Sequence, residues 1–253
     1  MMKGRMMTTR TTWLLIAGLS ALLLAGCKKD DGTVGTGDAV VLTSDDAADA
    51  LAGTLGGSQS TAGITAQLEE AAAIAGGGSL GKTDANAGTL WDTTITRTRT
   101  GIFTFAYSFR YSVTLANANR LDFGYTMKGT YDTPRLSSND SASATFQVSN
   151  LLAGTAYNVT GIYNRYGTQT SKVRNKASFS STIIFSTTAL LIDKSTKRVS
   201  GGSATLTIYG KSSTGNIYSF NATVTFLGNQ QATLVIGSKA YTINLATGEA
   251  TAA

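Results

Sequence analysis

Hydrophobic and polar residues alternate strictly over one long segment in the second half of the chain. Between positions 103 and 115 every odd position is apolar, and the even positions are small, polar or charged. The apolar residues are Phe103, Phe105, Tyr107, Phe109, Tyr111, Val113 and Leu115. A period of two sends successive side chains to opposite faces of a strand, so this pattern predicts a long strand with one buried and one wetted face.

The same alternation recurs several times towards the end of the chain, with short breaks between the runs. Gly201-Gly202, Thr214-Gly215 and Gly228-Asn229 are three of the breaks and are typical of turns. Counting a first strand over Leu90–Arg99, about ten strands follow one another without a helical pattern between them. Short links between successive strands predict an antiparallel up-and-down meander, and so a mainly β fold.

The continuous apolar face of such a sheet must be covered. Closure into a barrel removes both exposed edges and is the first expectation; a β-sandwich, or packing against preceding helices, is the alternative. A membrane-spanning barrel with its apolar face towards lipid is less favoured. Most of the alternating runs are shorter than the roughly 9–11 residues that a membrane strand needs.

Residues 27–88 have a different composition and are predicted to be a low-complexity tether ahead of an all-β domain at 89–253. From residue 32 to 88 the chain is rich in Gly, Ala, Ser, Thr and Asp and contains no aromatic residue. One or two short helices fit the pattern, the first capped by Ser44 and the second over residues 63–75. Their apolar stripes are Ala47, Leu51 and Leu55, and Ile64, Leu68, Ala71 and Ala75. Both are narrow and Ala-rich, so a flexible tether is the favoured interpretation.

The first 26 residues are typical of a signal peptide. Three basic residues precede an uncharged run from Trp13 to Leu24, which is shorter than the roughly 20 residues of a membrane-spanning helix. The run ends in Leu24-Ala25-Gly26-Cys27, which resembles the lipobox of bacterial lipoproteins. The resemblance implies cleavage before Cys27, a diacylglycerol on the Cys27 thiol and an acylated new amino terminus, with palmitate-like chains. Acyl chains of this kind would hold the protein firmly on a membrane.

The four residues after the single cysteine add a second resemblance. Lys28-Lys29-Asp30-Asp31 is similar to the export signal of Bacteroidetes-type surface lipoproteins. The resemblance implies an outer-membrane protein exposed on the cell surface. Its implied partners are outer-membrane lipid, through acylated Cys27, and the lipoprotein processing and export machinery. The alternative is a solvated charge cluster beside the anchor.

The composition removes several classes of chemistry. The chain has no His and one Cys, which excludes His-based acid–base catalysis and Ser-His-Asp or Cys-His nucleophiles, along with most zinc and iron sites. Residues 76–83 match the phosphate-binding G-x-x-x-x-G-K-[ST] pattern, but a helical pattern precedes them where that loop needs a strand. No catalytic residue, metal or cofactor is therefore expected.

Paired carboxylates could still support hydrolysis. The predicted β domain holds six acids, and nothing in the sequence draws two of them into one cleft. They are Asp92, Asp122, Asp132, Asp140, Asp193 and Glu249. The pattern places Asp132 and Asp140 at the two ends of a turn, and Asp122 on the wetted side of its strand. The chain is not expected to be an enzyme.

Charge is divided between the two regions. Residues 28–84 hold nine acids and three bases, whereas residues 85–253 hold six acids and fifteen bases. The densest basic stretch contains Arg165, Lys172, Arg174 and Lys176, which are expected on a solvated loop. Its alternative role is to meet an acidic glycan or lipopolysaccharide; nucleic acid is not an expected partner of an exported, lipid-anchored chain.

Two functions fit these features. The first is a non-enzymatic, lipid-anchored envelope protein whose surface β domain serves binding, adhesion or structure. The second is a lipocalin-like carrier that holds a small apolar ligand inside a barrel, with Phe105, Tyr107 and Phe123 lining the cavity. A filled interior would favour the first, and an internal cavity of several hundred Å³ would favour the second.

Overall fold

The computed structural model describes residues 41–56, 63–77, 90–100, 104–174 and 176–253. These residues belong to one compact unit, Ala39–Ala253. The predicted signal peptide, Cys27 and the export-like segment lie outside the described residues, as do residues 78–83 of the phosphate-loop match.

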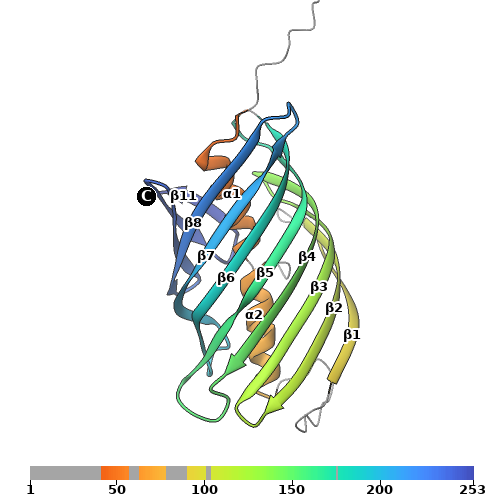
Figure 1. The fold of residues 1–253 in the computed structure, drawn as a ribbon, viewed down its shortest axis with the longest axis vertical. Coiled ribbons are helices and arrows are strands. Elements are labelled where there is room, and N and C mark those ends of the chain that lie inside the picture. The colour runs from red at the N-terminus through yellow and green to blue at the C-terminus, as the bar shows by residue number, and fades with distance from the viewer. Residues whose placement is uncertain (1–40, 57–62, 78–89, 101–103, 175) are drawn as a thin grey trace, which may run out of the picture. The chain divides into compact units, whose positions relative to one another are not determined.

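Within the described residues, eleven strands form a single antiparallel sheet in sequence order (Figure 1). This arrangement confirms the predicted mainly β, up-and-down meander. The strands are β1 (Leu90–Arg99), β2 (Thr104–Asn117), β3 (Arg120–Asp132), β4 (Leu136–Ser149), β5 (Ala156–Ser171), β6 (Ser178–Asp193), β7 (Val199–Ser212), β8 (Ile217–Gly228), β9 (Gln231–Ile236), β10 (Lys239–Asn244) and β11 (Glu249–Ala252).

Strands β3 to β8 are longer than their apolar runs suggested, at 12 to 16 residues each. The extra length comes from polar and small residues that continue the two-residue period. Asp140, which the sequence placed at a turn, lies inside β4. Ser138 and Asp140 continue the alternation of this strand, and their side chains point inward as those of Ala142 and Ala144 do. That placement of Asp140 at a turn was wrong.

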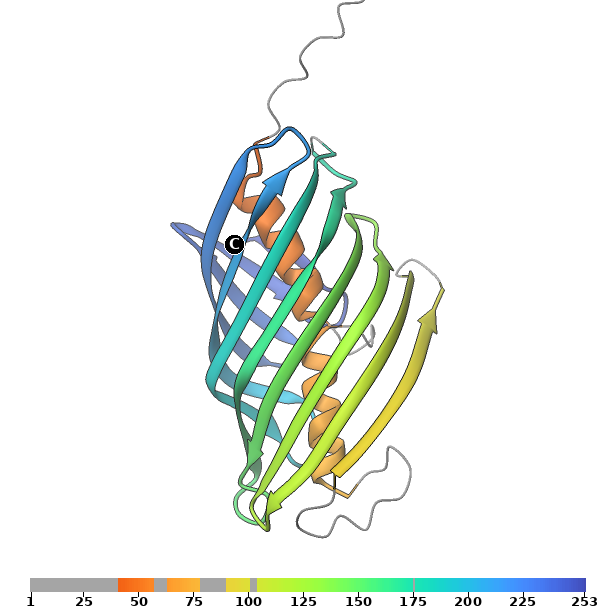
Figure 2. The ribbon, with the colours of Figure 1, turned by 45° about the vertical axis from the view of Figure 1, so that its right-hand side comes forward.

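The sheet curves strongly, and its two edges are not joined (Figure 2). β1 pairs with β2, and β11 pairs with β10. In the described part of the chain no ladder links β1 to β11. The described residues thus form a curved sheet with a concave and a convex face, and the expected closure into a barrel is not confirmed.

Two helices precede the sheet, α1 (Ser44–Leu55) and α2 (Ile64–Ala75), as the stripes predicted. The cap of α1 is Thr43 rather than Ser44. The Thr43 hydroxyl accepts a hydrogen bond from the Asp46 amide at 3.3 Å, and the Asp46 carboxylate accepts one from the Thr43 amide at 3.0 Å. This reciprocal capping box satisfies donors that the first turn would otherwise leave unpaired.

Both helices lie on the concave side of the sheet, where they are buried (Figure 2). Leu51, Leu55, Ile64 and Leu68 have no exposed surface. The favoured prediction of a flexible tether is wrong for these two segments. Their alanines let the helix backbone approach the strands closely, so a narrow stripe suffices when a curved sheet encloses it. No described helix has the length and apolarity needed to span a membrane.

Alternation sorts the side chains of the sheet into two sets. The rings of Phe105, Tyr107, Phe109 and Tyr111 point inward and are buried in one core with apolar residues of both helices. The convex face carries mainly Ser, Thr and Asn side chains, which are exposed along β4 and β5 and again along β7 and β8. The apolar face is therefore covered by the chain itself.

Candidate functional site

A small group of polar residues is buried on the concave face, beneath the C-terminal half of α1. Asp140 and Ser138 come from β4, and Arg165 and Gln169 from β5. Each has the same parity as the apolar residues of its strand, so its side chain must point inward. The position of these residues in the two-residue period of each strand is the feature of the sequence from which the site could have been predicted.

Arg165 and Asp140 form an ion pair whose side chains are 3% and 0% exposed. The Asp140 carboxylate also accepts hydrogen bonds from the Tyr107 hydroxyl at 3.1 Å and the Ser138 hydroxyl at 2.6 Å. The Ser138 hydroxyl in turn accepts from Arg165 Nη2 at 2.9 Å and from Gln169 Nε2 at 3.3 Å. A buried pair of charges needs such additional partners to offset its lost hydration.

The same guanidinium connects the sheet to α1. Arg165 Nη1 donates to the Thr54 hydroxyl at 2.6 Å, and that hydroxyl donates to the Ala50 carbonyl at 2.9 Å. The guanidinium carbon lies 4.9 Å from the centre of the Tyr131 ring. Burial raises the pKa of the Tyr163 hydroxyl nearby, so this phenol stays protonated. We call Arg165, Asp140, Ser138, Tyr107 and Thr54 the buried polar cluster.

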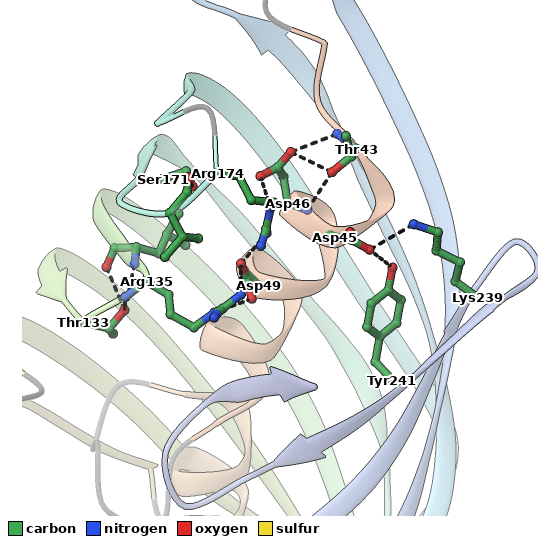
Figure 3. Close-up of polar contacts among 12 residues, drawn as sticks. Thr43, Asp45, Asp46, Asp49, Thr133, Arg135, Ser171, Arg174, Lys239 and Tyr241 are labelled. Atoms are coloured by element: carbon green, nitrogen blue, oxygen red, sulfur yellow. Dashed lines mark hydrogen bonds and ion pairs between the residues drawn. The ribbon is translucent and has the colours of Figure 1, made fainter. Parts of the chain in front are cut away.

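A second set of polar contacts holds the N-terminal half of α1 (Figure 3). Arg135 Nε donates to Asp49 Oδ1 at 3.0 Å, and its Nη2 donates to Asp49 Oδ2 at 3.2 Å. Arg174 Nε donates to Asp46 at 3.0 Å, and Arg174 Nη2 also contacts Asp49. The carboxylates of Asp46 and Asp49 are buried, whereas the side chains of Arg135 and Arg174 are 36% and 29% exposed, so these ion pairs are only partly shielded from water.

The third acid of this helix, Asp45, faces the opposite edge of the sheet. Its carboxylate accepts hydrogen bonds from the Tyr241 hydroxyl at 2.6 Å and from Lys239 Nζ at 3.1 Å (Figure 3). These two bonds lower the pKa of Asp45, because they stabilise its charged form. Together, Asp45, Asp46 and Asp49 tie α1 to strand ends on both sides of it.

These contacts correct the interpretation of the basic stretch. Arg165 is buried, Arg174 is bound to α1, and Lys172 forms an ion pair with Asp132 at 2.6 Å. Three of its four charges already have acidic partners. Part of the division of charge along the sequence is explained in this way, because three acids of α1, Asp45, Asp46 and Asp49, pair with bases of the sheet and its loops.

The carboxylates of the described sheet residues do not converge in one cleft. Asp122 lies on the convex side, as predicted, and is paired with Arg120 at 3.1 Å. Asp193 closes a turn, where hydrogen bonds from Ser195 and Thr196 lower its pKa to about 2. Glu249 lies in β11, and the side chain of Asp92 is outside the described residues. Among the described residues no group of three His, Cys, Asp or Glu is placed to hold a metal.

The convex face carries shallow grooves across β2 to β6. One, of about 620 Å³, is lined by hydroxyl, amide and cationic side chains; among them are Arg110, Lys128, Ser143, Asn164, Tyr166 and Thr182. A second, of about 660 Å³, lies further along the same strands and is lined largely by Ser, Thr and Gln residues. The sequence did not single out this face, because its members are spread over five strands.

Comparison with protein-family models, with curated proteins and with solved structures finds no match for this chain.

Proposed function

We propose that this chain is a lipid-anchored envelope protein without enzymatic activity, held in the outer membrane through acylated Cys27. Its sheet would face out of the cell and serve binding, adhesion or envelope structure. The lipobox-like and export-like segments support the anchor and its orientation. The filled concave face supports the role of the sheet, since it leaves the polar convex face as the surface for a partner.

The interior favours this proposal over a carrier. Phe105, Tyr107 and Phe123, which would line a ligand cavity, are each at most 3% exposed and pack in one core with α1 and α2. A lipocalin-like carrier would need a closed barrel, with its edge strands β1 and β11 joined, and space where the helices now lie. Native mass spectrometry of the full chain tests this alternative, which predicts a retained small apolar molecule.

Metabolic labelling tests the anchor. Cells expressing the full chain are fed an alkyne-bearing fatty acid, and the wild type is compared with Cys27→Ser. We expect labelled wild-type protein in the outer-membrane fraction and no label on the variant. Ser has a similar size and cannot form the thioether. An unlabelled wild type, or equal label on Cys27→Ser, would contradict the lipid anchor.

Surface exposure needs a separate measurement. Intact cells are treated with a protease that does not enter the periplasm, and loss of the full-length chain is followed. We expect the wild type to be cleaved, and a variant with Lys28–Asp31 replaced by alanines to be protected. Resistance of the wild type, with cleavage once the cells are lysed, would place the sheet on the periplasmic side.

A further inference from the structure

One row of residues crosses the convex face and carries two exposed tyrosines. Tyr166 on β5 is 65% exposed, and Tyr209 on β7 is 42% exposed. The register places Thr182 of β6 opposite both of them. Two interstrand spacings separate Tyr166 from Tyr209, which is about 10 Å. Tyrosine rings usually pack against other apolar groups, so two solvent-exposed rings in one row indicate a binding surface.

The row continues beyond the tyrosines along the groove of about 620 Å³. Ser141, Lys128 and Ser108 follow Tyr166 on β4, β3 and β2. Six neighbouring strands span roughly 24 Å at the ordinary interstrand spacing. The row therefore offers a long track perpendicular to the strands, with a ring at one end and another near its middle.

Charge on this track has one sign. Lys128 lines the groove, and no carboxylate lies among its described lining residues. Lys211, two residues beyond Tyr209 on β7, is exposed on the same face. Two carboxylates exposed on β3, Asp122 and Asp132, are bound to Arg120 and Lys172. A ligand for this surface is therefore expected to be an anion.

We propose that the Tyr166–Tyr209 row binds an acidic polysaccharide, a proposal that rests on the surface exposure proposed above. The C–H faces of alternate sugars would stack on the two rings, which present flat apolar surfaces. The sugar carboxylates would pair with Lys128 and Lys211. Sugar hydroxyls would meet Thr182, which lies between the two rings, and Asn164 and Ser143, which lie in the neighbouring row of the same groove.

Affinity electrophoresis tests this proposal. The full chain in a neutral detergent is run through gels containing alginate, a linear polyuronate, and through gels containing neutral hydroxyethyl cellulose. We expect alginate to retard the wild type and hydroxyethyl cellulose to leave its mobility unchanged. Tyr166→Ala and Tyr209→Ala should each weaken alginate binding by roughly fivefold. Tyr166→Phe keeps the ring and should bind as the wild type does.

A charge control separates the track from the net positive charge. Lys128→Gln should weaken binding about two- to threefold, in proportion to one lost contact. Lys176→Gln removes the same charge from the loop between β5 and β6 and should leave binding unchanged. Circular dichroism of each variant checks that the sheet is intact.

The proposal would be overturned if alginate did not retard the wild type, or if hydroxyethyl cellulose or single-stranded DNA retarded it equally. It would also be overturned if Tyr166→Ala and Tyr209→Ala both bound alginate as the wild type does. Equal losses in Lys128→Gln and Lys176→Gln would also overturn it, since they would show attraction by net charge alone. The assay uses purified protein and does not depend on Cys27. Its failure would leave the lipid anchor standing, and failure of the labelling experiment would leave the alginate result standing.

Discussion

The two helices on the concave face have the same length and similar Ala-rich composition, but the sheet holds them by different means. α1 has a capping box, ion pairs from the buried carboxylates of Asp46 and Asp49, and a hydrogen bond between the Thr54 hydroxyl and Arg165. α2 begins at Gly63 without a side-chain cap. Apolar burial is common to both helices, and α1 adds ion pairs to Arg135, Arg174 and Lys239.

This difference indicates what each contact type contributes. Apolar burial stabilises a helix at any position on an apolar surface, because the hydrophobic effect is not directional. The ion pairs of α1 and its hydroxyl contact with Arg165 fit one position only, so they fix which strands α1 faces. α2 follows α1 after a short connection and needs less specification of its own. We therefore expect α1 variants to have the larger effects on stability.

Removing the acid of the buried polar cluster should have the largest effect. Asp140→Ala leaves Arg165 charged and buried, with the Tyr107 hydroxyl short of its acceptor, and should lower the free energy of unfolding by about 3–5 kcal/mol. Urea unfolding of the full chain, followed by circular dichroism, measures the loss.

A double variant is the matched control for Asp140→Ala. Arg165→Met combined with Asp140→Leu leaves no charge in the buried polar cluster and should be less destabilised than Asp140→Ala alone. A double variant that is less stable than the single one would contradict the assignment of the loss to an unpaired guanidinium.

Cutting the ion pairs of α1 should have the next largest effect. Asp49→Asn keeps the shape of the side chain but removes the charge that Arg135 and Arg174 share, and should cost about 1–3 kcal/mol. Asp45→Asn removes one charge from the exposed side of the same helix and should cost at most about 1 kcal/mol. Equal losses in urea unfolding would argue against shielding of the Asp49 pair from water.

Much of this arrangement could be predicted from the alternating pattern, because a period of two fixes the face of every residue in a strand. The meander follows from the short links, and the two helices from their stripes. The same rule also gives the inward orientation of Arg165 and Asp140. Because both residues are charged, Asp140 was predicted at a turn and Arg165 on a surface loop, although their positions in the two-residue period indicate the buried face.

Two features could not be predicted from the sequence. The pairing of Arg165 with Asp140 depends on the register of β4 against β5, which sets Arg165 opposite Ala142. The burial of α1 and α2 depends on the curvature of a sheet built from residues later in the chain. A narrow Ala-rich stripe has little affinity for a flat surface, and only the concave space makes it sufficient.

The polar contact of α2 with the sheet can be tested without changing a charge. The Tyr111 hydroxyl donates to Gln67 Oε1 at 2.8 Å in the interior. Tyr111→Phe removes this donor and should cost about 1 kcal/mol. Tyr125→Phe is the control, because its buried hydroxyl has no hydrogen-bond partner among the described residues, and it should be neutral or slightly stabilising. If Tyr125→Phe lowered the free energy of unfolding more than Tyr111→Phe does, the stabilisation could not be assigned to the hydrogen bond between Tyr111 and Gln67.

The smallest expected effect separates the helices by the sign of their pH dependence. Burial raises the pKa of Glu69 on α2 above 4.5, and Arg198 opposes this only in part. The folded state therefore holds the Glu69 proton more tightly than the unfolded state. Its stabilisation is complete below pH 4.5 and is lost as the pH rises through the raised pKa.

Glu69→Gln should accordingly be more stable than the wild type at pH 7, by no more than about 1 kcal/mol, since the side chain remains partly in water. The two proteins should converge below pH 4.5. Asp45 on α1 has a lowered pKa, so its contribution is present above pH 3.8 and is lost as the pH falls through the lowered value. Asp45→Asn should thus lose stability at pH 7, where Glu69→Gln gains it. Thermal unfolding between pH 3 and pH 7 measures both variants, and a loss in both at pH 7 would mean that α2 is held by charge as α1 is.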